Sequence, residues 1–72
     1  MAYTVAMNWT KIIEDLRAWG LSETDIAELA HTTQPTINRI KRRRQRVEWE
    51  MGERLLTLHR ICAAIQTIKK AA

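Results

Sequence analysis

The apolar residues of this chain recur at the three- and four-residue spacing of α-helices over separate stretches. The first stretch consists of Trp9, Ile12, Ile13, Leu16 and Trp19. These positions fall on one face of a helix, so we expect both tryptophans in the core. Asn8 suits the N-cap position and Gly20 suits the C-terminal cap. The pattern predicts a first helix at about residues 9–19.

A second helix is predicted to begin after Ser22. The Ser22 hydroxyl can accept from the backbone N–H of Asp25, and the Asp25 carboxylate can bond back to Ser22. This is a capping box with Asp in place of Glu. We expect the helix to end near His31 and to bury Ile26, Leu29 and Ala30, with Ala27 beside them.

A third helix follows a short break at Thr32 and Thr33. Thr33 is a good N-cap, and Pro35 falls in the first turn, where its missing N–H costs nothing. Ile37 and Ile40 lie on one side and should hold this helix to the core. The positions expected to face elsewhere are Gln34, Pro35, Thr36, Asn38 and Arg39.

The last apolar stretch predicts a helix at residues 50–70, which is long for so small a chain. It follows a connector from which Val47 and Trp49 should pack onto the domain. About two turns of this helix would complete the core. The apolar positions of its remaining turns would then be exposed, and such surface usually marks an interface. The predicted homodimer interface is Leu58, Ile61, Cys62, Ile65 and Ile68. The alternative is that Ile65 and Ile68 fold back onto their own domain.

Composition agrees with a compact, all-α, four-helix domain that spans residues 1–72, with a loose arm at residues 1–7. Hydrophobic residues make up 46% of the chain, which contains only two Gly and one Pro. So few residues leave little room for a deep pocket. Gly-rich phosphate loops and nucleophile–base motifs are also missing from the sequence. We therefore do not expect an enzyme, and we expect no cofactor.

The charge is unevenly distributed along the chain. Residues 1–38 contain two cations and five acids, whereas residues 39–46 contain six cations and no acid. Half of the twelve Lys and Arg residues therefore lie within eight consecutive positions. Such a cluster is typical of a protein that binds a polyanion. The simpler interpretation is a solvated face.

The tract from Glu23 to Arg42, ETDIAELAHTTQPTINRIKR, resembles the helix-turn-helix of phage Cro and repressor proteins and their bacterial relatives. The resemblance lies in Ile26 and Ala27, the TTQPTINRI run, and its two isoleucines. It implies a lambda-repressor-like fold in which the second helix of the motif enters the major groove of DNA. The family usually has Gly where this chain has His31, and an apolar residue where it has Thr32. That turn position tends to need a positive φ, which His tolerates better than most residues.

The resemblance also implies roles for individual residues. The residues expected to read bases are Gln34, Pro35, Thr36 and Arg39. Gln can pair bidentately with adenine and Arg with guanine, which agrees with these roles. The residues expected to contact phosphates are Thr33, Asn38, Lys41, Arg42, Arg43, Arg44 and Arg46.

The remaining polar residues suggest no further chemistry. Cys62 is the only cysteine, so no internal disulfide can form and a reducing compartment fits. His59 and Cys62 could share a helix face, but a structural zinc site needs four ligands, so we expect no metal.

No stretch is long and apolar enough for a membrane span, and no signal pattern is present. We expect the cytoplasm of a bacterial host, in association with the nucleoid.

The sequence thus predicts a small transcriptional regulator of the Cro type, which binds double-stranded DNA as a homodimer on an inverted repeat. One alternative is a helical protein–protein module, such as an antitoxin or antirepressor, whose basic stretch meets an acidic partner. Another is a DNA-targeting accessory of a recombination machine.

Overall fold

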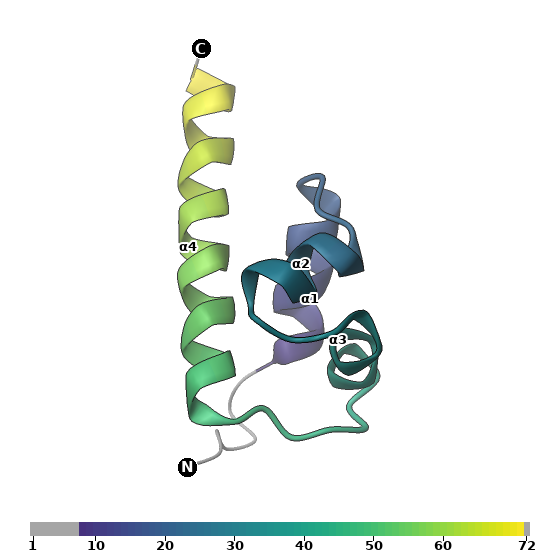
Figure 1. Ribbon diagram of the computed structural model, residues 1–72. Coiled ribbons are helices and arrows are strands. Elements are labelled where there is room, and N and C mark those ends of the chain that lie inside the picture. The colour runs from purple at the N-terminus through teal and green to yellow at the C-terminus, as the bar shows by residue number, and fades with distance from the viewer. Residues whose placement is uncertain (1–7, 72) are drawn as a thin grey trace.

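The computed structural model describes residues 8–71 and is all-helical. Its four helices are α1 (Trp9–Ala18), α2 (Glu23–Leu29), α3 (Gln34–Lys41) and α4 (Trp49–Ala71). Helices α1, α2 and α3 form a cluster beside α4, whose C-terminal part extends past them (Figure 1). The four predicted helices are confirmed, and the predicted loose arm at residues 1–7 lies outside the described residues.

The helices begin where the sequence predicts. The Asn8 side chain accepts from the backbone N–H of Lys11 at 3.0 Å. Ser22 and Asp25 form the predicted capping box, with bonds of 3.0 and 3.1 Å. Thr33 occupies the N-cap position of α3 but makes no side-chain capping bond, because its hydroxyl pairs with that of Thr36 at 2.9 Å.

The first three helices end in the same backbone motif. In each, one residue with positive φ follows the C-cap, and the next N–H reaches back five residues to a helical carbonyl. These are Schellman motifs, which satisfy carbonyls at a helix end. The positive-φ residues are Gly20, His31 and Arg43, with φ of 108°, 59° and 61°. The left-handed conformation expected of His31 is confirmed.

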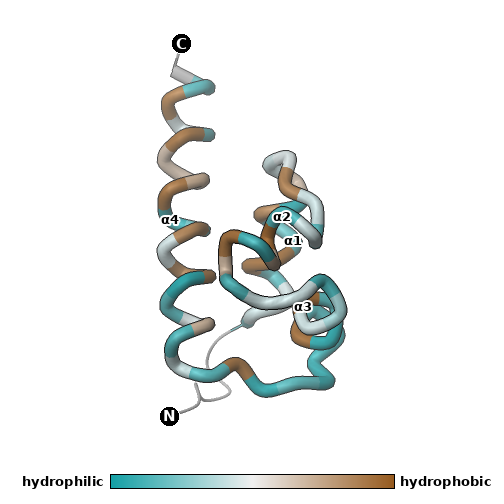
Figure 2. Tube along the Cα trace, in the orientation of Figure 1, coloured by the Kyte–Doolittle hydropathy of each residue, from teal (hydrophilic) through white to brown (hydrophobic). Residues whose placement is uncertain are grey.

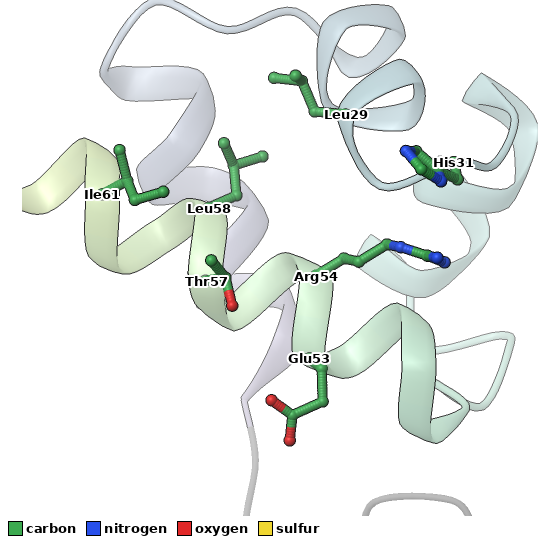
Figure 3. Close-up of a pocket in the computed structure, with 7 residues that line it drawn as sticks. All are labelled: Leu29, His31, Glu53, Arg54, Thr57, Leu58 and Ile61. Carbon is green, nitrogen blue, oxygen red and sulfur yellow. The ribbon is translucent and has the colours of Figure 1, made fainter.

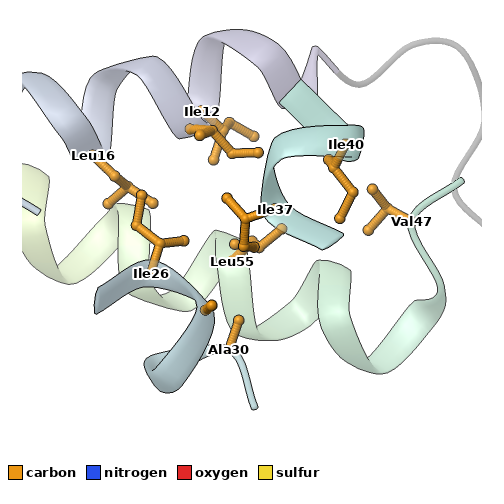
Figure 4. Close-up of a cluster of buried hydrophobic side chains, with 10 residues drawn as sticks. Ile12, Leu16, Ile26, Ala30, Ile37, Ile40, Val47 and Leu55 are labelled. Carbon is orange, nitrogen blue, oxygen red and sulfur yellow. The ribbon is translucent and has the colours of Figure 1, made fainter. Parts of the chain in front are cut away.

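The core draws on all four helices and the connector before α4 (Figure 4). Its buried apolar residues are Ile12, Ile13, Leu16, Ile26, Ala27, Ala30, Ile37, Ile40, Val47 and Leu55. Helix α3 packs mainly on α1 and α2, and α4 packs mainly on α1. The buried positions expected in α3 are therefore confirmed, as is the burial of Val47.

The expected burial of Leu29 is wrong, and the tryptophans lie less deeply in the core than expected. Leu29 is 53% exposed, because Ile26, Ala27 and Ala30 occupy the inner face of the short α2. Trp9 and Trp19 are only half-buried and pack at the edge of the core. Trp49 begins α4 and is also half-exposed.

Helix α4 carries two apolar faces. Leu55 is fully buried, and Leu58 and Cys62 are partly buried against the core. Ile61, Ile65 and Ile68 are exposed, and hydrophobic positions continue along the part of α4 that extends past the other helices (Figure 2). Ile65 and Ile68 therefore do not fold back. Of the residues predicted for the dimer interface, Leu58 and Cys62 pack partly against their own domain, whereas the three isoleucines are exposed.

Candidate nucleic-acid interface

Helix α3 is held by its apolar side and by its C-terminal end. Its residues Ile37 and Ile40 are buried in the core. The Thr10 hydroxyl of α1 donates to the backbone carbonyl of Lys41 at 2.7 Å, so it satisfies a carbonyl in the last turn of α3. These contacts fix the orientation of α3 and leave its polar side outward.

The predicted base-reading residues divide into two groups. Gln34, Pro35 and Arg39 are exposed. Two hydrogen bonds hold the Arg39 guanidinium in place in the free protein. Its Nε donates to Gln45 Oε1 at 2.9 Å, and its Nη2 donates to Thr36 Oγ1 at 3.4 Å. Thr36 itself is only 9% exposed.

The expected outward orientation of Thr36 is therefore wrong. It lies one position before the buried Ile37, at the inner margin of the helix, and its hydroxyl bonds to the hydroxyl of Thr33. Its position suits support of Arg39 better than direct contact with a base.

An exposed basic segment continues directly from the end of α3. Its members are Arg42, Arg43, Arg44 and Arg46, all exposed. Within residues 8–71, no ion pair involves any of these four arginines. The turn at Arg43 reverses the chain, and the Arg44 N–H donates to the Arg39 carbonyl at 2.8 Å. The segment is therefore held close to the exposed side of α3.

Glu23, the first residue of α2, joins α2 to α3. Its Oε2 lies 2.9 Å from the Lys41 ammonium and 3.5 Å from the Arg17 guanidinium of α1. Its Oε1 accepts from Gln34 at 2.6 Å and from Asn38 at 3.4 Å. The hydrogen bond from Lys41 is the main cause that lowers the pKa of Glu23, and partial burial opposes it.

This cluster changes the predicted site. Gln34, Asn38 and Lys41 were each expected to meet DNA, and all three contact one carboxylate in the free protein. Glu23 was not among the predicted site residues, because its partners on α3 lie 11 to 18 positions away in the sequence. No local pattern could have indicated them.

No family model, curated protein or solved structure matches this chain. A function must therefore be argued from the site itself. Within the described residues, no group of three or more His, Cys, Asp or Glu side chains is placed to hold a metal ion. None of the helices in residues 8–71 has the length and apolar character to cross a membrane.

His59 has a structural position. Its Nε2 lies 2.9 Å from the Asp15 carboxylate, and its ring packs on Trp19 with centroids 5.0 Å apart. Asp15 also contacts Lys11, which is the main cause that lowers the pKa of Asp15, followed by the bond to His59. These contacts link α1 to α4.

A second surface of interest lies between α2 and α4. An apolar groove of about 360 Å³ is lined by Leu29 and His31 on one side, and by Leu58 and Ile61 on the other (Figure 3). Ile61, which lines this groove, is also one of the three exposed isoleucines of α4. Arg54 also lines this groove.

Proposed function

We propose that this protein is a sequence-specific regulator that binds double-stranded DNA, with α2 and α3 acting as a helix-turn-helix of the phage Cro and repressor type. The observation that carries the proposal is the continuity between the polar side of α3 and four exposed arginines that form no ion pair with the other residues of the described part of the chain. An α-helix with its side chains is about 10–12 Å in diameter, so α3 fits the roughly 12 Å width of the major groove.

The two parts of this surface have different tasks. Gln34, Pro35 and Arg39 project from the outer side of α3 and are proposed to contact base edges. The arginines after α3, together with Thr33, contact phosphates and set the position of the protein on the duplex. Repression follows from occupation of promoter DNA.

Helix α4 is proposed to supply the dimer contact. Ile61, Ile65 and Ile68 lie on one side of α4 and are exposed, with Leu29 at the margin. A symmetric pair would use the same patch on both copies. Two recognition helices about 34 Å apart would then meet an inverted repeat on successive turns of DNA.

The proposal is tested by measuring affinity for a duplex across salt concentrations. On a half-site duplex that binds one protomer, four phosphate contacts predict a slope of log K against log salt near −3.6, and about a 100-fold loss between 50 and 200 mM salt. The double variant Arg43→Ala, Arg44→Ala should make the slope shallower by about 2. Lys69→Ala, Lys70→Ala removes the same charge at the end of α4 and should leave the slope almost unchanged.

Absence of binding at 50 mM salt would overturn the proposal and favour a helical module for an acidic protein partner.

The division of the surface into base-reading and phosphate-binding residues has its own test. Arg39→Ala should cost about 1–3 kcal/mol on one sequence and relax discrimination at one base pair. Arg43→Ala should weaken all sequences alike, and identical behaviour of the two variants would contradict the division.

A further inference from the structure

The cluster around Glu23 has the donors that a phosphate would take. The Gln34 and Asn38 amides and the Lys41 ammonium all point to one carboxylate. Amide and ammonium groups are also common donors to the DNA backbone. The Glu23 carboxylate therefore occupies three donors of α3 that the proposed DNA surface would otherwise offer to the duplex.

The carboxylate remains charged under ordinary conditions. Its side chain is 11% exposed, and its contacts with Lys41 and Arg17 favour the ionised form. It therefore neutralises the charge of Lys41 in the free protein, whereas no carboxylate of residues 8–71 neutralises the arginines after α3. A phosphate that approached Lys41 would meet a second negative charge within a few ångströms.

We propose that Glu23 is an intramolecular competitor of a DNA phosphate, which takes over Lys41 and Asn38 when the duplex binds. The inference rests on the proposed DNA-binding function and adds a control on its strength. Through Lys41 and Asn38, Glu23 lowers the affinity for every duplex, because phosphate contacts and charge repulsion do not depend on sequence. It thereby limits the non-specific attraction of the adjacent arginine segment.

A purely structural role predicts a different result. If Glu23 only fastened α2 to α3, its removal would loosen the recognition helix and weaken binding. The variant Glu23→Gln separates these cases, because its amide oxygen can still accept from Asn38 or Lys41 while the negative charge is gone. Glu28→Gln is the matched control, since Glu28 lies on the same helix, is exposed, and loses the same charge.

The experiment is a fluorescence anisotropy titration, at several salt concentrations, of one labelled half-site duplex that binds one protomer. Glu23→Gln should bind about three- to tenfold more tightly than the unmodified protein. Its salt slope should be steeper by about 0.9, because Lys41 becomes available for a phosphate. Glu28→Gln should change affinity less than twofold, and adding Lys41→Met should abolish the gain of Glu23→Gln.

Equal effects of the two glutamine variants would overturn the inference, as would weaker binding by a folded Glu23→Gln. A second measurement needs no variant. The carboxyl carbon of Glu23, followed by NMR against pH, should report a higher pKa in the DNA complex than in the free protein, because Lys41 has left for a phosphate. An unchanged or lower value would also overturn it. If the unmodified protein binds no DNA, the proposed function itself fails.

Discussion

Replacing His31 by glycine should stabilise the protein. His31 has φ of 59° after the end of α2, where its N–H donates to the Glu28 carbonyl at 3.2 Å. A residue with a Cβ costs about 1–2 kcal/mol in this left-handed conformation. Glycine avoids that cost, but its greater freedom in the unfolded chain returns about 0.5–1 kcal/mol. The expected net gain is about 0.5–1 kcal/mol.

The gain should appear as a melting temperature higher by about 2–8 °C, since 1 kcal/mol corresponds to about 4–8 °C in a domain of this size. Thermal unfolding followed by circular dichroism measures it. His31→Ala is the control, because it removes the imidazole and keeps the Cβ. If His31→Gly melts at or below His31→Ala, relief of backbone strain at this position is not a source of stability.

Three further predictions concern the other helix end, the acidic contacts and the exposed stripe. Gly20→Ala should lower the free energy of unfolding by about 1 kcal/mol in urea titrations, although nothing lies within 4 Å of the added Cβ, because φ is 108°. Folded-state contacts lower the pKa of Asp15 and of Glu23, so their contribution is present at neutral pH and should be lost as pH falls from about 5 to 2. Urea titrations at several pH values should show a flatter acid limb for Glu23→Gln, and an unchanged limb would refute this. Ile65→Glu should leave the fold intact and reduce the apparent mass in sedimentation at high concentration, whereas a parent protein that is strictly monomeric would refute the dimer.

Features controlled by neighbouring residues were predictable from the sequence. The bonds at Asn8 and in the Ser22–Asp25 box need partners only three positions away. The helix end at Gly20 likewise follows from one residue type. The positive φ of Arg43 was not predicted, because arginine carries no local preference for that conformation.

Features controlled by distant packing were predicted less well. The spacing of Leu29 suits the inner face of a helix, but α2 is short and α4 leaves that position uncovered. Thr36 was expected to face outward, but it lies four positions before the buried Ile40, on the same side of α3. The contacts of Glu23 depend on how α2 crosses α3, which no local pattern describes.

The central claim is that α3 reads a DNA sequence, and selection of bound duplexes from a random pool tests it most directly. The claim predicts enrichment of an inverted repeat with half-site centres about 10 base pairs apart. Repeating the selection with Arg39→Ala should relax one base pair in each half-site. Recovery of unenriched sequences by the unmodified protein, or no recovery at low salt, would contradict the claim.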